Sequence, residues 1–355
     1  EIGFLHSGFE KLGEHLDFNQ YITITDRMNY LSPLCNNVAY ALSAEKLMGI
    51  EVTKRARYIR VLMCELSRIG DHFISVGMQA VDLGAMTVFL YAFRLREDIY
   101  DLFELATGTR LTTSYTRVGG LMRDIPEGYE RAVTKVLNDV DDVVNDIETL
   151  LNKNRIWHQR TKGVGVITKE DAISYGLTGP MARASGIDWD LRVNEPYSSY
   201  DDFEFDVAIG LNGDVFDRYL VRMEEIRQSV KICRQVLQEL PSGDVNIDSE
   251  SGVVLPPKDE VYNSIEGLIY HFEITMPNRG IKPPVGEAYV PTESPNGELG
   301  FYIVSDGSRT PYRVRTRPPS FINYSIFCRV MEGLMLSDAV AILGSFNIIA
   351  GEMDR

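Results

Sequence analysis

Hydrophobic residues recur at intervals of three and four along several long stretches of this chain, which is the spacing of an amphipathic helix. The clearest stretch covers residues 54–80. Its apolar positions are Ile59, Leu62, Met63, Leu66, Ile69, Phe73, Val76 and Ala80. Residues 87–106, 129–151 and 214–240 have the same character, and Pro241 closes the last of them. The pattern therefore predicts four long helices in the first two-thirds of the chain.

Shorter segments have the character of strands and turns. Residues 163–169, "GVGVITK", are β-branched and bounded by glycine, which predicts a strand. Residues 241–257, "PSGDVNIDSESGVVLPP", are typical of a linker or exposed loop. Further on, the Asn296-Gly297 pair predicts a turn. Strands are expected over 298–305 and 311–316.

The final stretch, residues 321–346, returns to a helical pattern. Taken together, these elements predict a mainly α fold with small antiparallel β parts, in the α+β class. We expect residues 1–355 to form one domain, with a helical core at about 20–240 and the loop at 241–257. A C-terminal hairpin plus helix would then occupy residues 258–355.

Composition and charge narrow the possible partners. The chain has 355 residues, of which 44% are apolar, so it can bury a sizeable core. Its formal net charge of −15 argues against nucleic-acid binding and against direct adhesion to anionic lipid headgroups. If the protein works at a membrane, we expect a protein partner to hold it there.

No apolar run reaches the roughly 18 residues that a membrane helix needs. The run at 85–93 stops at Arg94, and the run at 339–350 is short. No signal peptide is visible. The sequence opens at Glu1, without methionine, inside what resembles structured sequence, so we expect an N-terminal segment to be missing.

The sequence offers no familiar cofactor or metal motif. The four cysteines are far apart and form no C-x-x-C pair, which predicts buried free thiols of a cytosolic protein. Its five histidines lack the spacing of a metal site. No phosphate-binding glycine loop follows a strand, so we expect the chain to bind no NADH and no metal itself.

Two residues stand out as candidates for chemistry. Tyr30, in "TDRMNYLSPLCNN", is either an ordinary core tyrosine or a proton donor to a bound carbonyl. Asp82 is the one formally charged residue in residues 73–93. It is either the N-cap of the next helix or an ionised partner for a buried donor. A third candidate is the arginine-rich strand, which is either a set of alternate exposed side chains or a docking surface for an acidic partner. Its arginines are Arg309, Arg313, Arg315 and Arg317.

Nine ordered blocks of the chain resemble the D subunit of respiratory complex I, the 49 kDa quinone-site subunit of NADH:quinone oxidoreductase. The resemblance runs from Gly3 to Arg355. The blocks are "GFLHSGFEKL", "TDRMNYLSPLCNNVAYALSAEKLMGI", "RARYIRVLMCELSRIGDH", "DLGAMTVF", "YTRVGGL", "GLTGPMARASGIDWDLR", "GELGFYIVSDG", "YRVRTRPPSF" and "GEMDR".

That family is homologous to the large subunit of [NiFe] hydrogenases, so the resemblance implies a helical bundle of that type, without an N-terminal β/loop segment. Hydrogenases hold nickel with two C-x-x-C pairs. Those pairs fall here at Asn29 and Ser32, and at Ile349 and Glu352. None is cysteine, and soft-metal ligation needs thiolates. The resemblance therefore implies that the old metal cavity serves as a pocket for a quinone headgroup.

The resemblance also implies roles for individual residues. Tyr30 matches the quinone tyrosine of the D-R-x-x-Y motif, and Asp82 matches the acid of the L-D-I/L-G-A motif. In the family that acid pairs with a histidine of an upstream H-P-x-x-H-G loop, which this sequence lacks. His6 belongs to the L-H-x-G block and does not take that role. Ile349 and Ala350 are expected to line the quinone channel.

Two departures from the family pattern bear on the partner's iron–sulfur cluster. Ser7 stands where many members have arginine, and Thr112 where many have histidine. Both positions are thought to lie near the terminal cluster of the partner protein. Loss of a nearby cation should lower the potential of that cluster. We therefore expect a low-potential electron chain that feeds menaquinone.

The resemblance implies one component of a proton-translocating NADH:quinone oxidoreductase, inactive alone. Its expected partners are the B subunit with the terminal [4Fe-4S] cluster, the C subunit, other peripheral-arm subunits, the membrane-arm H subunit, and ubiquinone or menaquinone as substrate. It would lie peripherally on the cytoplasmic side of the bacterial inner membrane. The alternatives are a related quinone reductase that oxidises ferredoxin or a deazaflavin, the large subunit of a membrane-bound hydrogenase, and a purely structural paralogue.

Overall fold

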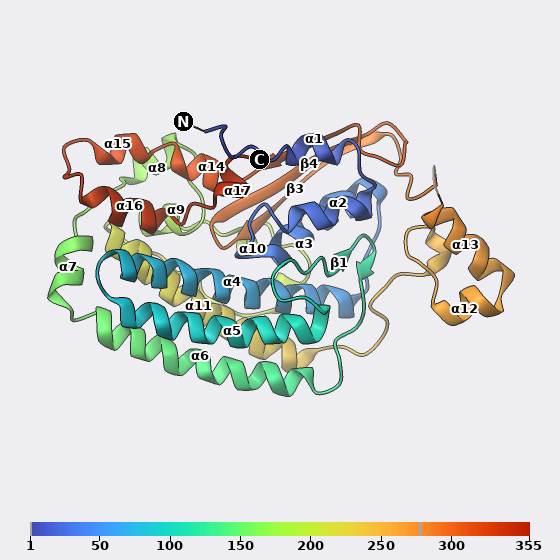
Figure 1. The fold of residues 1–355 in the computed structure, drawn as a ribbon, viewed down its shortest axis with the longest axis horizontal. Helices are drawn as coiled ribbons and strands as arrows, with labels where there is room; N and C mark the ends of the chain where they lie inside the picture. Colours follow the sequence, from blue (N-terminus) through green and yellow to red (C-terminus); the bar gives the residue numbers. More distant parts are fainter. Residues whose placement is uncertain (1, 277–278) are drawn as a thin grey trace.

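The computed structural model describes residues 2–276 and 279–355. Its central layer is a bundle of long helices that lie side by side, with a three-stranded sheet above them in Figure 1. The bundle helices are α3 (Pro33–Met48), α4 (Lys54–Asp82), α5 (Met86–Thr107), α6 (Tyr129–Leu151) and α11 (Val215–Glu239). The mainly α fold with small antiparallel sheets agrees with the fold class expected from the sequence.

Helix α4 is the axis of the bundle and packs against α5 and α11. Its apolar positions at helical spacing are all buried, so the periodicity does mark the core face. The Thr53 hydroxyl caps its first turn by accepting a hydrogen bond of 3.3 Å from the Ala56 amide. The four predicted long helices are thus confirmed, with ends within two residues of the expected ones.

The main sheet is antiparallel in the order β3 (Gly286–Ser294), β4 (Gly297–Ser305) and β5 (Arg313–Arg317). Ser294 pairs with Gly297, so the predicted turn at Asn296-Gly297 joins β3 to β4. The strands expected over 298–305 and 311–316 are confirmed as β4 and β5. Strand β3 was not predicted, since Pro291 and two glutamates weaken its strand pattern. Proline is tolerated there because β3 is an edge strand.

Two expectations from the sequence were wrong. Residues 163–169 form no strand; two isolated backbone hydrogen bonds, Ile167 to Gly213 and Val215 to Val164, hold them. The helix expected over 321–346 is three helices, because the chain turns at Ser325 and again at Gly333, whose φ is 80°. They are α14 (Pro319–Tyr324), α15 (Phe327–Met331) and α16 (Asp338–Phe346).

Two helices that were not expected, α12 (Lys258–Asn263) and α13 (Ile265–Thr275), lie at one end of the molecule, away from the bundle (Figure 1). Between α11 and α12 the chain has only one short 3₁₀ turn, Ser249–Ser251. The other small elements surround the bundle. They are α1 (Phe9–Gly13), α2 (Phe18–Thr25), β1 (Thr116–Arg117), β2 (Gly120–Leu121), α7 (Arg155–Thr161), α8 (Lys169–Ser174), α9 (Pro180–Ala184), α10 (Leu191–Asn194), the 3₁₀ turn Tyr200–Asp202 and α17 (Ala350–Met353).

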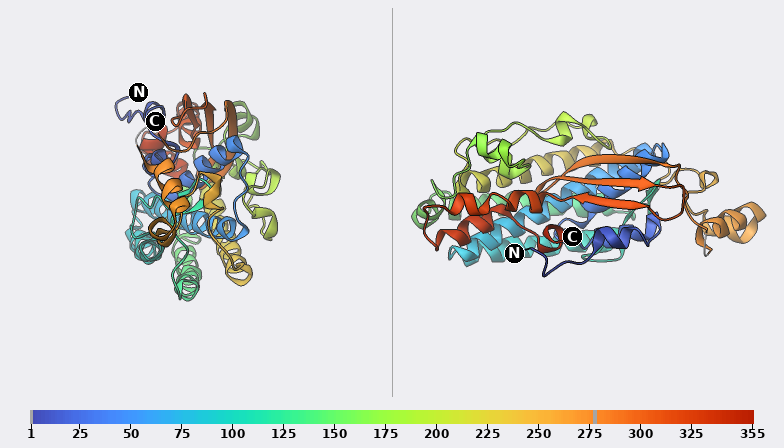
Figure 2. Two further views of the ribbon diagram at one scale, coloured as in Figure 1. Left: turned by 90° about the vertical axis from the view of Figure 1, so that its right-hand side faces the viewer. Right: turned by 90° about the horizontal axis from the view of Figure 1, so that it is seen from above.

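The two ends of the chain lie together, as Figure 2 shows. The Asp354 carboxylate accepts hydrogen bonds of 3.0 Å from the Gly3 amide and 2.7 Å from the Leu5 amide. His6 lies 3.9 Å from the same carboxylate. The C-terminal helix α17 is thereby held beside the segment that leads into α1 and α2.

Candidate functional site

The loop that carries Tyr30 joins α2 to α3 and is fixed by two asparagines. The Asn29 side-chain oxygen accepts hydrogen bonds from the amides of Leu31 and Ser32, at 3.2 and 3.3 Å. From α3, the Asn36 amide group donates to the carbonyl oxygens of Thr25 and Asn29. The backbone on both sides of Tyr30 is therefore held from below.

Tyr30 itself points away from the core. It is 42% exposed, whereas Asn29 and Ser32 on either side are completely buried. Its hydroxyl has no hydrogen-bond partner among the residues that the structure describes. The interpretation of Tyr30 as an ordinary core tyrosine is therefore wrong, because a buried phenol normally finds a partner within the chain.

Helix α17 packs directly against the Tyr30 loop. A methyl group at Gly351 would lie 2.8 Å from the Arg27 carbonyl oxygen, so only glycine allows this approach. Ala350 is partly exposed beside it. Ile349 is only 3% exposed, and its amide donates to the Ser320 hydroxyl at 3.3 Å. Tertiary contacts thus bring Ile349 and Ala350 to the Tyr30 loop, with the Ile349 side chain in the core.

A buried carboxylate anchors the same loop to the segment before β1. Asp26 accepts hydrogen bonds from the Asn37 side chain at 2.7 Å, from the Ser114 amide at 3.0 Å and from the Ser114 hydroxyl. Burial raises the pKa of Asp26 to about 6, while the hydrogen bonds from Ser114 and Asn37 lower it. The Thr112–Ser114 segment is therefore held against the loop that bears Tyr30.

Asp82 lies elsewhere on the bundle. It is the last residue of α4, and the N-cap of α5 is Ala85, so the N-cap interpretation of Asp82 is wrong. A methyl group at Gly344 on α16 would lie 3.7 Å from its carboxylate. Asp82 is exposed and makes no hydrogen bond or ion pair within residues 2–276 and 279–355. Its carboxylate is therefore free to accept a partner.

Beneath these residues lies a network of buried charges that ties the bundle to β3. The Arg183 guanidinium contacts Glu225 at 2.8 Å, Glu293 at 2.7 Å and Asp190 at 3.4 Å. His72 on α4 contacts the other Glu225 oxygen at 2.7 Å, and the guanidinium of Arg183 helps hold the pKa of Glu225 well below its usual range. Removing one partner of a buried ion pair strongly destabilises a protein. The network therefore fixes the helices of the bundle and β3 relative to one another.

The sequence positions that resemble hydrogenase ligand sites converge in part. Ser32 and Glu352 are both completely buried, and both face Asp71 on α4. The Ser320 hydroxyl donates to Glu352 at 2.6 Å. Within the described residues, no group of three or more His, Cys, Asp or Glu side chains is placed to hold a metal ion. This cluster is therefore an arrangement of oxygen and amide groups.

The comparisons with known proteins identify the family of this chain. The family model described as respiratory-chain NADH dehydrogenase, 49 kDa subunit, matches residues 82–355. The chain belongs to this 49 kDa subunit family. It is 52% identical over 354 residues to the D subunit of the NADH-quinone oxidoreductase of Geotalea uraniireducens (strain Rf4). The match covers 100% of this chain and 90% of that protein.

Two other relatives of this 49 kDa family member are informative. The D subunit of the NADH-quinone oxidoreductase of Geobacter sulfurreducens is 50% identical over 354 residues, with 100% of this chain and 90% of the relative covered. A protein of Bdellovibrio bacteriovorus, named as the C/D subunit of NADH-quinone oxidoreductase, is 49% identical over 355 residues. There the match covers 100% of this chain and 63% of the relative.

Several residues of this 49 kDa family member were missed at the level of sequence. Asp71, Ser320 and Asn347 gather near Glu352 but were not singled out, and Asn296 was noted only as part of a turn. No signal in the sequence set Asp71 apart, because α4 also buries the charged residues Arg60, Glu65 and Arg68. In the arginine-rich strand, ion pairs within the chain involve Arg309 with Asp17 at 3.5 Å, Arg313 with Glu14 at 2.8 Å and Arg317 with Glu298 at 3.5 Å. Arg315 is exposed.

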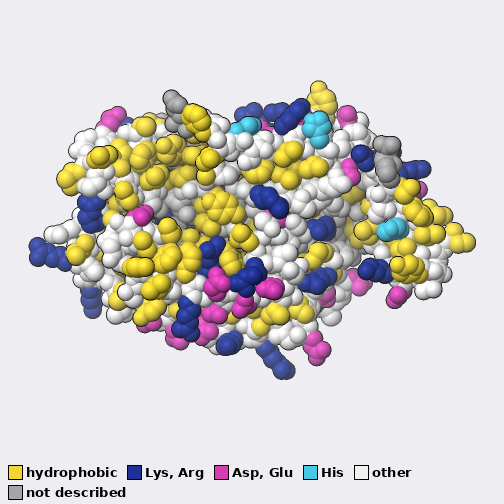
Figure 3. All heavy atoms as spheres, in the orientation of Figure 1, with side chains coloured by type: hydrophobic (Ala, Val, Ile, Leu, Met, Phe, Trp, Pro, Cys, Tyr) yellow, Lys and Arg dark blue, Asp and Glu magenta, His cyan; other side chains and the backbone are white. Residues whose placement is uncertain are grey.

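Hydrophobic side chains gather on the face of the 49 kDa family member that is turned to the viewer in Figure 3, over α5 and α15–α16. The exposed members are Met86, Leu90 and Tyr91 of α5 and Leu334, Met335, Leu336, Val340 and Leu343 at α16. A contiguous apolar face of this kind marks a binding surface. No helix in the described part of the chain combines the length and apolar character needed to cross a bilayer.

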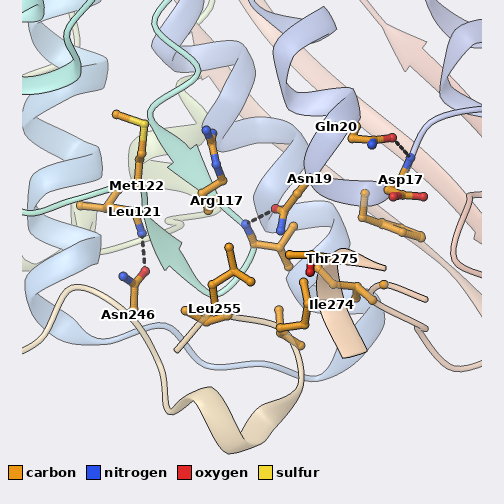
Figure 4. A pocket seen from close by; sticks show the side chains of 16 residues that line it. Asp17, Asn19, Gln20, Arg117, Leu121, Met122, Asn246, Leu255, Ile274 and Thr275 are labelled. Carbon is orange, nitrogen blue, oxygen red and sulfur yellow. Dashed lines mark hydrogen bonds between the residues drawn. The ribbon is translucent and has the colours of Figure 1, made fainter. Parts of the chain in front are cut away.

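A separate cavity of about 550 Å³ lies between α2, the β1–β2 ribbon and the loop before α12 (Figure 4). Arg117, Asn19 and Asn246 contribute polar groups, and the walls are otherwise mostly apolar. None of Tyr30, Asp82, Ile349 or Ala350 lines it. This cavity is therefore distinct from the region that sequence and family membership both indicate.

Proposed function

We propose that this chain forms, together with the B subunit of a proton-translocating NADH:quinone oxidoreductase, the site at which quinone is reduced. The observation that carries the proposal is Tyr30. Its hydroxyl is free and half-exposed on a loop that is fixed from below by Asn29, Asn36 and Asp26. A donor of this kind can bind a carbonyl oxygen without losing an existing hydrogen bond.

Quinone reduction to a quinol consumes two electrons and two protons. The four cysteines do not fit an iron–sulfur cluster. Three of them are buried and Cys328 is exposed. Among the described residues, no three His, Cys, Asp or Glu side chains are grouped so that they could hold a metal ion. We therefore place the electron-donating [4Fe-4S] cluster on the B subunit. Tyr30 donates a hydrogen bond, and then a proton, to one quinone oxygen.

Asp82 has the second role in this proposal. Its free carboxylate at the end of α4 would orient and stabilise the protonated imidazole of the family's upstream H-P-x-x-H-G loop, which lies outside this sequence and would serve the other quinone oxygen. About 16 Å of helix separates Asp71 from Asp82 at 1.5 Å per residue, so the two acids lie at different levels of α4. Ala350, at the start of α17, and the backbone of Ile349 before it are assigned to the channel wall beside Tyr30.

The apolar face over α5 and α16 supports docking onto other subunits. We assign it to the contact with the B and H subunits. The relative named as a C/D subunit supports the C subunit as a further neighbour among the peripheral-arm proteins. In this proposal the partners hold the chain peripherally on the cytoplasmic side of the bacterial inner membrane. Ubiquinone and menaquinone both have the carbonyl oxygens that Tyr30 requires.

The test uses membranes that contain the whole complex with Tyr30→Phe. We expect NADH:quinone reduction to fall by about two to four decades, as for loss of a proton donor. NADH oxidation with an artificial acceptor that bypasses the quinone site should not change. Tyr262→Phe is the matched control, because Tyr262 on α12 is 82% exposed and far along the chain. Equal quinone rates in both variants would contradict the proposal.

A further inference from the structure

Six buried polar residues from six different parts of the chain meet beneath the Tyr30 loop. They are Ser32 before α3, Asp71 on α4, Asn296 in the β3–β4 turn, Ser320 on α14, Asn347 after α16 and Glu352 on α17. We call this set the acid cluster. It contains two carboxyl groups, Asp71 and Glu352, both completely buried. The proposed mechanism above uses neither of them.

The hydrogen bonds inside the acid cluster satisfy one oxygen of each acid. The Asn347 side-chain amide donates to Asp71 Oδ1 and to Asn296 Oδ1, each at 2.6 Å. The Ser320 hydroxyl donates to Glu352 Oε2 at 2.6 Å. Asn347 is held in place by its left-handed backbone at the end of α16, with φ 55° and ψ 56°.

Four polar atoms of the acid cluster are left over. Asp71 Oδ2, Glu352 Oε1, the Ser32 hydroxyl and the Asn296 side-chain nitrogen have no hydrogen-bond partner among the described residues. Two are acceptors and two are donors. Ser32 lies close enough to Asp71, and Asn296 to Glu352, to lower the pKa of each acid. Neither pair reaches hydrogen-bond geometry. Buried groups of this kind are normally satisfied by an internal water, which both donates and accepts.

The resting acid cluster favours a state in which only one of its two acids is ionised near neutral pH. Burial is the main cause that raises both pKa values, and repulsion from Asp71 adds to it for Glu352. The pKa of Glu352 rises to about 8. The groups that face the pair are His72 beside Asp71, Arg222 from α11, Tyr100 from α5 and Arg317 from β5.

None of these facing groups neutralises the pair directly. His72 is bound to Glu225, and Arg317 pairs with Glu298. Arg222 forms no ion pair within the described part of the chain; its guanidinium donates only to the Arg218 carbonyl, at 3.4 Å. Since no cation contacts either carboxylate, one proton is the remaining way to balance the second charge.

The acid cluster lies directly against the loop that carries Tyr30. Ser32 is two residues beyond Tyr30, and its hydroxyl faces Asp71. Glu352 follows Gly351, which packs on the Arg27 carbonyl of the same loop. We propose that Asp71 and Glu352 hold one proton between them through an internal water, and that this proton replaces the one that Tyr30 gives to the reduced quinone. The inference rests on the proposed function of Tyr30.

The transfer balances. The quinone takes two electrons from the partner's cluster, Tyr30 loses its O–H proton to a quinone oxygen, and the proton of the acid cluster then moves to the Tyr30 phenolate. Carboxylic acids are stronger acids than phenols, so this last transfer is downhill. The acid cluster is left with both acids ionised until solvent supplies a proton. Asp71 and Glu352 act through Tyr30 and are positioning residues.

The test compares the pH profiles of NADH:quinone reduction in membranes that contain the whole complex. In Glu352→Gln and in Asp71→Asn we expect the rate of NADH:quinone reduction to fall by about tenfold or more at pH 8 to 9. The fall should be smaller at pH 6, because solvent protons can reprotonate Tyr30 there. Glu352→Asp should restore part of the rate. Glu332→Gln, on the exposed end of α15, is the matched control.

The outcomes separate this inference from the proposed function. If Tyr30→Phe is impaired while Glu352→Gln keeps the wild-type profile, the proton-holding role is overturned and the function of Tyr30 stands. If Tyr30→Phe is normal, the proposed function itself fails. Should the acid variants not assemble, infrared difference spectra of the wild-type complex decide. Reduction of the bound quinone must then change the infrared band of a protonated carboxyl group. Absence of that change overturns the inference.

Discussion

Asn347 donates a hydrogen bond of 2.6 Å to Asp71, although the two residues are 276 positions apart in the sequence. This contact joins the end of α16 to the middle of α4. It also brings the C-terminal helix α17 over the Tyr30 loop. As a result, Glu352 of α17 faces Asp71 of α4. The pairing of distant segments, rather than any local motif, creates the acid cluster.

The stability of the protein should depend on pH through Glu352. The pKa of this carboxyl rises from an ordinary 4.5 to about 8 on folding, because burial disfavours its charged form. Between these values the native state binds more protons than the unfolded state. The contribution is therefore fully present below about pH 4.5 and is lost as pH rises through about 8, at up to about 1.4 kcal/mol per pH unit.

Glu352→Gln removes this dependence, because glutamine is neutral at every pH. We expect the inactivation temperature of the assembled complex to fall less between pH 6 and pH 9 in the variant than in the wild type. The exposed Glu332→Gln should behave as the wild type. An identical decline in all three proteins would show that Glu352 ionises normally.

Gly351→Ala should displace the Tyr30 loop. The added methyl group would lie 2.8 Å from the Arg27 carbonyl and 3.0 Å from the Met28 carbonyl, so the loop or α17 must shift. Overpacking of this kind costs about 1–3 kcal/mol. We expect a raised KM for quinone with normal NADH oxidation by an artificial acceptor. Gly70→Ala is the control, since a methyl group there meets no atom within 4 Å.

Asp82→Asn should impair quinone reduction without unfolding α4. The carboxylate makes no contact within the described residues that the amide would lose, so stability should change little. The activity should fall by about two decades or more if Asp82 stabilises a protonated imidazole. Rates are compared with those of Asp146→Asn, a change on the exposed side of α6. A normal quinone rate in Asp82→Asn would leave the carboxylate without a catalytic role.

Ser7→Arg should raise the potential of the partner's terminal cluster. Ser7 is exposed and only its hydroxyl is bound, to the Leu5 carbonyl at 3.3 Å, so arginine can be accommodated. A nearby cation stabilises the reduced, more negative cluster. A redox titration followed by electron paramagnetic resonance measures the change. Ser242→Arg, in the loop after α11, should leave the potential unaltered. An ordinary, pH-dependent ubiquinone-type potential in the wild type would contradict the low-potential expectation.

The errors in the predicted elements share one cause. Residues 163–169 have the composition of a strand but find no neighbouring strand, since their backbone bonds go singly to the segment at 213–215. Strand β3 forms despite Pro291, because β4 provides a full ladder beside it. Strand formation depends on a partner, and a partner is not visible in local sequence.

The sequence by itself determined the local secondary structure and the family of this protein. The three- and four-residue periodicity predicts the long helices, because a helix makes its hydrogen bonds within its own segment. The ordered motifs are enough to indicate the family and to direct attention to Tyr30 and Asp82.

Only the tertiary structure decided that Tyr30 is exposed with a free hydroxyl, that Asp82 ends α4, and that Asp71 meets Glu352 beneath the Tyr30 loop. These properties depend on which surfaces pack together over hundreds of residues. Burial and the proximity of a second charge change the chemistry of a carboxyl group, and both are set by packing rather than by the neighbours of a residue along the chain.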